Sequence, residues 1–154
     1  MNAFAGFGGG LLAVPLLALL YPLKTVAPFT NLLGFSANVL LVKTYYKNIQ
    51  YKILIPLLIG NLLGSLVGIH FLIIAQNVIL LKLLGVIITL SSVTLFITDK
   101  KVVFKPNYLI GFIIGSVSGV LSALFAVGGP PLIIYLSSIF KDKAGLRATS
   151  LLFF

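Results

Sequence analysis

Two clusters of glycine, each followed by a polar dipeptide, hold the residues of this chain that could bind a ligand. Glycine permits backbone conformations that an α-helix forbids, and a helix that starts again after such a break exposes N–H groups and a partial positive charge. Threonine, asparagine and serine side chains add further hydrogen-bond donors. This combination is suited to a small anion. The predicted substrate-binding residues are Gly8, Gly9, Gly10, Thr30, Asn31, Gly128, Gly129, Thr149 and Ser150.

The two groups of residues lie in one register. Gly9 and Gly128 differ by 119 positions, and the same offset superposes the two polar dipeptides and one lysine of each half. Internal repeats with interrupted helices in corresponding places are the sequence mark of many secondary transporters. For either cluster alone, a kink or a tight packing contact without a ligand explains the glycines equally well. The shared register favours a site.

Enzyme and metal chemistry lack the residues they need. The chain has no cysteine, one histidine and two acidic residues, Asp99 and Asp142, which both fall in predicted loops. These cannot build a zinc site or a nucleophile–base–acid triad. We therefore predict that the protein is not an enzyme and that it has no catalytic residue, no metal and no cofactor. No carboxylate is predicted inside the membrane, where it could bind a sodium ion or relay a proton.

Composition defines the environment of these residues. Of 154 residues, 60% are hydrophobic and only 8% are charged, which is too few charges for the surface of a soluble domain. Apolar runs of about 20 residues, enough to cross ~30 Å of hydrocarbon as a helix, follow one another along the chain. The predicted fold class is all-α: a polytopic helical membrane protein of about 5–6 transmembrane segments with glycine-broken helices. The net charge of +9 sits in small basic sets between the runs, so no nucleic acid is predicted as a partner.

The apolar runs predict the elements that must position the site. They lie at about residues 2–21, 25–45, 53–75, 78–98, 108–140 and 144–154. The fifth run is too long for one upright helix, and the stretch VGGPP at 127–131 interrupts it. Asn107, after Pro106, is the predicted N-cap of the helix that follows the polar loop. The predicted organisation is a first repeat at 1–98, a polar loop at 99–107 and the start of a second repeat at 108–154.

Loop charges predict the orientation. Lysines surround the second and fourth connections, and an excess of basic residues marks the cytoplasmic side. The fifth connection is also basic, with Lys141, Lys143 and Arg147. Either residues 108–140 form a hairpin that returns to the inner side, or this connection departs from the rule.

Two helices carry glycines at every fourth position. In lipid, such a stripe lets another helix backbone approach closely, so we predict a packing role. A substrate path along the glycine face is the alternative. The glycines are Gly60, Gly64 and Gly68 in one run, and Gly111, Gly115 and Gly119 in another.

The order of these motifs resembles a known family. The segments GFGGGLLAVPLL, FTNLLGFSANVL, YYKNIQYKILIPLLIGNLLGSLVG, GFIIGSVSGVLSALFAVGGPPLIIYL and ATSLL are together similar to the sulfite exporter TauE/SafE family, over essentially the whole chain. That resemblance implies a bacterial-type inner-membrane transporter of two related halves, with about eight helices in all. It also implies that each glycine cluster and its polar dipeptide form one half of the site. Against that family pattern, we expect this chain to be shortened at both ends.

The resemblance implies a segment of a transporter that exports sulfite, sulfonate or a related small anion across the plasma membrane by alternating access. Its partners would be the anionic substrate and the lipid bilayer, with a second copy of the chain or a separate C-terminal half to complete it. The alternatives are a non-transporting packing or interaction subunit of the membrane, and an inactive fragment of a transporter.

Overall fold

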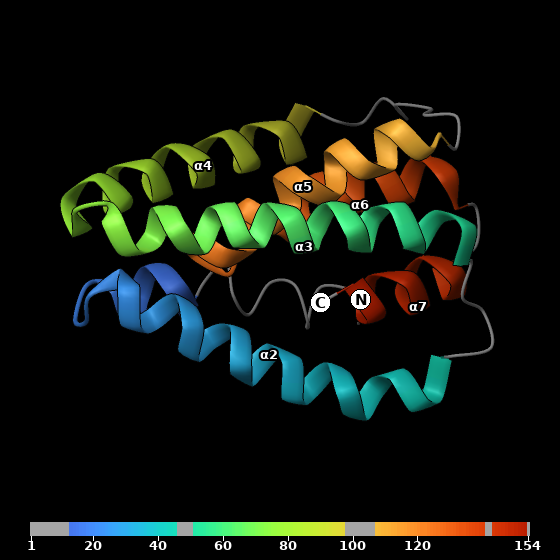
Figure 1. The fold of residues 1–154 in the computed structure, drawn as a ribbon, viewed down its shortest axis with the longest axis horizontal. Coiled ribbons are helices and arrows are strands. Elements are labelled where there is room, and N and C mark those ends of the chain that lie inside the picture. Colours follow the sequence, from blue (N-terminus) through green and yellow to red (C-terminus); the bar gives the residue numbers. More distant parts are fainter. Residues whose placement is uncertain (1–12, 46–50, 98–106, 141–142, 154) are drawn as a thin grey trace.

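The structure, a computed structural model, is a bundle of α-helices that describes residues 13–45, 51–97, 107–140 and 143–153 (Figure 1). Residues 13–18 are helical, and a turn joins them to the labelled helices. These are α2 (Leu23–Tyr45), α3 (Tyr51–Ile74), α4 (Asn77–Ile97), α5 (Tyr108–Phe125), α6 (Gly129–Ile139) and α7 (Lys143–Phe153). The predicted all-α class is therefore confirmed for the described residues. The number of segments that cross the membrane stays a prediction.

The predicted boundaries follow from local signals. The run expected at 53–75 is α3, and the run expected at 78–98 is α4. Asn107 is the N-cap of α5, as predicted: its backbone is extended, and its Oδ1 accepts a hydrogen bond from the Leu109 N–H at 3.1 Å. An N-cap side chain of this kind satisfies one of the N–H groups that the first helical turn leaves unpaired.

The long apolar run at 108–140 is a hairpin of two helices. α5 ends at Phe125, and Ala126 adopts the left-handed conformation with φ 53°. α6 then begins at Gly129 and runs back along α5, because the Tyr135 hydroxyl reaches the Asn107 carbonyl oxygen at 3.3 Å. The end of α6 therefore lies at the same end of the molecule as the start of α5. Of the two topologies left open by the loop charges, the hairpin is the one observed.

The glycine stripes of α3 and α5 pack against each other. All six stripe glycines are buried. A Cβ atom on Gly64 would collide with the backbone of Ser116, and one on Gly115 would collide with the backbone of Leu57. Because contacts advance along both helices together, α3 and α5 run parallel, with their backbones in direct contact. The predicted packing role of the stripes is confirmed.

Two apolar clusters lie at opposite ends of this helix pair. One joins the ends of α3 and α5 to the starts of α2 and α4, and it includes Leu72, Phe125 and Leu80. The other joins the start of α3 to α6 and α7, and it includes Leu57 and Leu136. Each cluster therefore brings together helices that are distant in sequence.

Two hydrogen bonds fix the start of α2 against its neighbours. The Lys24 ammonium donates to the Ile73 carbonyl oxygen at 2.7 Å, where α3 ends. The Leu23 N–H donates to Oδ1 of Asn77, the first residue of α4, at 3.0 Å. A cation at a helix C-terminus and an acceptor at a helix N-terminus both satisfy backbone groups left over by the helices.

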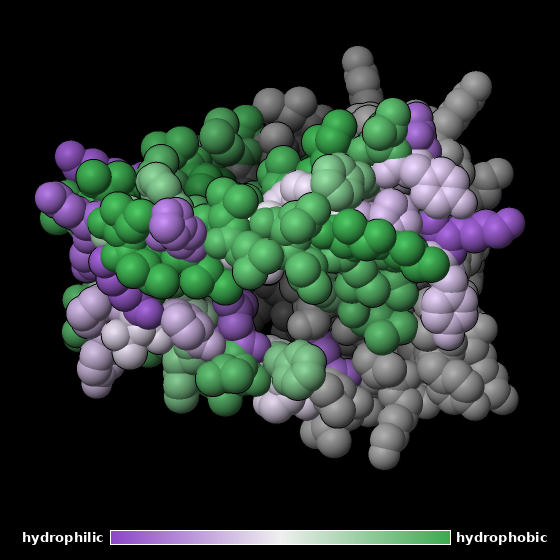
Figure 2. Space-filling model, in the orientation of Figure 1, coloured by the Kyte–Doolittle hydropathy of each residue, from purple (hydrophilic) through white to green (hydrophobic). Residues whose placement is uncertain are grey.

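The outer surface is apolar along the middle of the bundle. Figure 2 shows hydrophobic residues over the centre of the visible face and hydrophilic residues gathered towards its two ends. Large apolar side chains on α3 are exposed, such as Ile73 at 67% and Leu66 at 58%. Among the described helices, α3 and α5 are long and apolar enough to cross a membrane. An exposed apolar band between polar ends is the surface that a bilayer requires.

Candidate functional site

The break between α5 and α6 is held by two serines of α5. Ser118, which is fully buried, donates a hydrogen bond from its hydroxyl to the Gly128 carbonyl oxygen. A Cβ atom on Gly128 would collide with the Ser118 carbonyl oxygen and with the Ser122 hydroxyl, so only glycine fits at this position. The absence of a side chain at Gly128 is thus what lets the chain turn back close to α5. The glycine predicted from sequence is a close-approach position.

The start of α6 offers few backbone donors. Gly128 is the N-cap residue and makes no side-chain hydrogen bond as a cap, and Pro130 and Pro131 stand within the first turn. Proline has no backbone N–H, so two of the donors that a helix N-terminus normally presents are missing. An anion at this break would depend on side-chain donors more than on the helix terminus.

Asn31 connects α2 to the break. Its Nδ2 atom donates to the Ser122 carbonyl oxygen at 2.9 Å, and the same oxygen accepts the Ala126 N–H at 2.8 Å. Carbonyl oxygens near a helix C-terminus lack intrahelical partners, and a carbonyl oxygen has two lone pairs, so both bonds can form. The Asn31 side chain is exposed and uses one of its two amide N–H groups in this bond.

The hydroxyls of Thr30 and Ser150 are satisfied within their own helices. Thr30 donates to the Val26 carbonyl oxygen at 2.8 Å, and Ser150 donates to the Leu146 carbonyl oxygen at 2.8 Å. Bonds of this kind to the preceding turn are common for hydroxyl side chains in helices. A substrate would have to compete with these bonds for the hydroxyl protons.

Thr149 differs from its counterpart Thr30. Its side chain is fully buried, and its hydroxyl has no hydrogen-bond partner among the described residues. It lies on the face of α7 that carries Leu146 and Phe153, which pack against α3 and α6. A buried hydroxyl without a partner costs about 1–3 kcal/mol. Thr149 is therefore a predicted site residue with a buried donor that the described residues leave unused.

The structure joins some predicted site residues and leaves others apart. Asn31 and Gly128 both contact Ser122: Asn31 bonds to its carbonyl oxygen, and Gly128 lies against its hydroxyl. The two helices that carry the polar dipeptides, α2 and α7, pack against each other. Gly129 is buried in the first turn of α6. The first glycine cluster, Gly8, Gly9 and Gly10, lies outside the described residues.

Ser118 and Ser122 were not predicted as residues of the site. Their signal is a pair of hydroxyl residues four positions apart, on one face of a helix and just before a glycine break.

The apolar exposed faces, the interrupted hairpin and the polar contacts at its turn are features of helical membrane transporters. Residues 1–154 match the family described as sulfite exporter TauE/SafE, and the chain belongs to that family of membrane transporters. The searches of curated proteins and of solved structures gave no match.

Proposed function

We propose that this chain is part of an exporter of sulfite, sulfonate or a related small anion, working by alternating access, with no enzymatic activity. Membership of the TauE/SafE family supports the transport of such an anion. The observation that carries the site is the hydrogen bond of Asn31 to the Ser122 carbonyl oxygen, because it places a polar side chain of α2 directly at the break. The broken hairpin and α2 are then the elements that move relative to each other.

The substrate-binding residues are those of the two glycine clusters and the two polar dipeptides. Thr149 and Asn31 contribute hydrogen-bond donors to the anion, and the glycines let the backbone approach it. Neutral donors suit a sulfur oxyanion, since they bind its oxygens without requiring a fixed counter-charge. A buried, unpaired hydroxyl such as that of Thr149 gains most from such a ligand, because the ligand removes its desolvation cost.

The halves of the transporter are proposed to be inverted repeats. Residues 13–18 and α2 correspond to α6 and α7 at the offset of 119 that relates Gly9 to Gly128. α2 and α7 are in contact and run in opposite directions (Figure 1). Opposed repeats around a central site are the usual basis of alternating access. The end that carries the starts of α3, α5 and α7 faces the cytoplasm of a bacterial-type inner membrane, because the basic connections attach there.

The proposal is tested by sulfite export. Cells that lack their own sulfite exporter would produce this chain, alone and in a longer version that continues into the further helices expected of the family. Asn31→Leu should abolish sulfite tolerance and sulfite efflux while membrane insertion stays equal to that of the unchanged chain. The leucine side chain has no hydrogen-bond donor, so it cannot bond to the Ser122 carbonyl oxygen or to an anion.

Ser36→Ala is the matched control on the same helix. The Ser36 hydroxyl is exposed and donates to the Leu33 carbonyl oxygen at 2.8 Å, within α2. This change should leave efflux as it was. Equal efflux from Asn31→Leu and the unchanged chain would refute the assignment of Asn31 to the site.

A packing subunit without transport is the second candidate, and one observation favours it. Asn31 binds a helix-terminal carbonyl oxygen, and such a bond can serve packing alone, worth about 0.6–2 kcal/mol in a membrane. Under this alternative, neither version of the chain exports an anion, and Asn31→Leu lowers only the stability of the helix assembly.

A further inference from the structure

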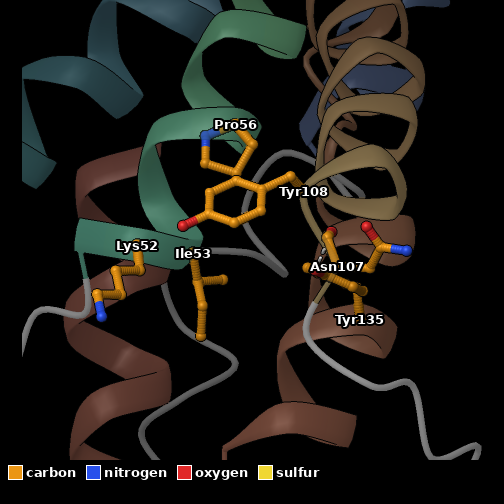
Figure 3. A pocket seen from close by; sticks show the side chains of 6 residues that line it. All are labelled: Lys52, Ile53, Pro56, Asn107, Tyr108 and Tyr135. Carbon is orange, nitrogen blue, oxygen red and sulfur yellow. Dashed lines mark hydrogen bonds between the residues drawn. The ribbon is translucent and has the colours of Figure 1, made fainter.

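A cavity lies at the opposite end of α5 from the break. It encloses about 230 Å³ at the first turns of α3 and α5, where the side chain of Tyr135 reaches from α6 (Figure 3). The residues that line it are Lys52, Ile53, Pro56, Asn107, Tyr108 and Tyr135. None of them belongs to the glycine clusters or to the polar dipeptides.

The lining combines one positive charge with phenol groups and an apolar wall. Lys52 supplies the charge, and none of the described residues that line the cavity is a carboxylate. The Tyr108 ring extends from α5 towards α3, with its hydroxyl on the α3 side (Figure 3). Ile53 and Pro56 supply the apolar wall. A lysine and a phenol hydroxyl in one lining offer a charged and a neutral hydrogen-bond donor.

Burial and a hydrogen bond fix the Tyr135 side chain, which forms one wall of the cavity. This side chain is only 1% exposed, and its hydroxyl donates to the Asn107 carbonyl oxygen at 3.3 Å. The cavity is therefore bounded by side chains from three helices, one of which returns from the break. Its volume is below the ~300–1,000 Å³ typical of pockets for drug-sized ligands, which favours a small group.

We propose that this cavity binds an anionic sulfonate or phosphate group, with its oxygens on Lys52 and Tyr108 and its apolar part against Ile53 and Pro56. Such a group has two sources: a small anion from solution, or the headgroup of an anionic lipid. Basic pockets between membrane helices at the cytoplasmic side recognise anionic headgroups, and the positive-inside rule places this end there. The site is separate from the one at the helix break.

Direct binding to the purified full chain tests the proposal. The first probe is trifluoromethanesulfonate, followed by fluorine NMR line broadening in detergent. The second is dioleoylphosphatidylglycerol, followed by native mass spectrometry, with dioleoylphosphatidylcholine as the neutral lipid. Lys52→Gln should weaken the binding of at least one anionic probe by about tenfold, because a charge-assisted hydrogen bond is lost. Tyr108→Phe should weaken it by a smaller factor, and Lys52→Arg should retain it.

Two matched variants separate the cavity from general charge effects. Lys82→Gln removes an exposed lysine of α4, and Tyr51→Phe removes the exposed phenol that precedes Lys52 in the sequence; neither is among the residues that line the cavity. Both should bind the probes as the unchanged chain does. If Lys52→Gln does not fold, the test is the comparison of probe binding by Tyr108→Phe with probe binding by Tyr51→Phe.

The pattern of losses identifies the source. Loss of the sulfonate probe alone assigns the cavity to a soluble anion, loss of the phosphatidylglycerol alone assigns it to a lipid headgroup, and loss of both supports the shared chemistry. Equal losses in Lys52→Gln and Lys82→Gln, or no loss in either, would overturn the proposal. Neither probe requires export. The binding proposal for this cavity and the proposed export function can therefore be refuted separately.

Discussion

The α3–α5 contact and the α5–α6 break both depend on glycine, but the glycines have different neighbours. In the contact, Gly64 meets the backbone of Ser116 and Gly115 meets the backbone of Leu57. At the break, Gly128 meets the Ser118 carbonyl oxygen and also the Ser122 hydroxyl, and the Ser122 carbonyl oxygen accepts a hydrogen bond from Asn31. The first arrangement is a closed helix–helix interface. The second brings polar side chains from two helices to one turn.

This difference shows which feature marks a candidate site in so apolar a chain. A glycine stripe indicates only that two helices approach closely. A glycine break becomes a candidate site when side-chain donors lie at it or on the helices around it, as with Asn31 and the unpaired hydroxyl of Thr149. Substitutions that separate backbone contact from polar contact test this distinction.

The largest effect is expected at the helix–helix interface. Gly64→Ala would place a methyl group against the Ser116 backbone, which cannot turn away as a side chain can. α3 and α5 would have to separate along their length, so we expect the free energy of unfolding to fall by about 3 kcal/mol. Unfolding in mixed micelles, followed by loss of helix signal with added denaturing detergent, measures this change.

Gly85→Ala is the control for helix propensity. Gly85 lies in α4, and a Cβ atom there would meet nothing within 4 Å. Alanine should stabilise α4 by roughly 0.5–1 kcal/mol through propensity alone. If Gly64→Ala raises stability as Gly85→Ala does, the two stripes are not in direct backbone contact.

A smaller effect, of opposite sign, is expected at Thr149. Thr149→Val replaces a buried, unpaired hydroxyl by a methyl group of similar size, and the free energy of unfolding should rise by about 1–2 kcal/mol. The same variant should lose anion efflux, because the donor to the substrate is gone. Such a gain in stability with a loss of transport is expected of a ligand-binding residue.

Two controls sharpen the Thr149 result. Thr149→Ser keeps the hydroxyl and should keep efflux. Thr30→Val removes a hydroxyl that is already bonded to the Val26 carbonyl oxygen, so it should not stabilise the protein. A loss of stability on Thr149→Val would mean that this hydroxyl has a hydrogen-bond partner. Thr149 would then have no free donor for an anion.

Much of the fold was predictable from local sequence signals. The apolar runs set the helix boundaries, and the Pro106-Asn107 pair marked the start of α5. The parallel pairing of α3 with α5 was not predictable, because each glycine stripe indicates a close partner without naming it. The hairpin at 108–140 was one of two topologies left open, since loop charges do not reveal whether a helix returns.

The candidate site was predictable in its residue types and not in its contacts. Thr30 and Thr149 occupy equivalent positions of the predicted repeat, yet one hydroxyl is bonded within its helix and the other has no partner among the described residues. The bond from Asn31 to Ser122 joins residues 91 positions apart, so no local pattern contains it. Such differences arise from tertiary packing, which acts after the helices have formed.

The smallest effect reverses the usual rule that glycine weakens a helix. Ala126 has φ 53°, a left-handed conformation that costs an L-residue about 1–2 kcal/mol and costs glycine little. Ala126→Gly removes that cost, but it also loosens the unfolded chain and removes a half-buried methyl group, so we expect a net gain of about 0.5 kcal/mol. Ala123→Gly, one turn earlier inside α5, should instead lose about 1 kcal/mol or more, because a helical position gains nothing from glycine. Unfolding of both variants in the same micelles gives the comparison. Opposite signs would establish the turn at Ala126 as a true interruption between two helices, and equal losses would mean that α5 continues through it.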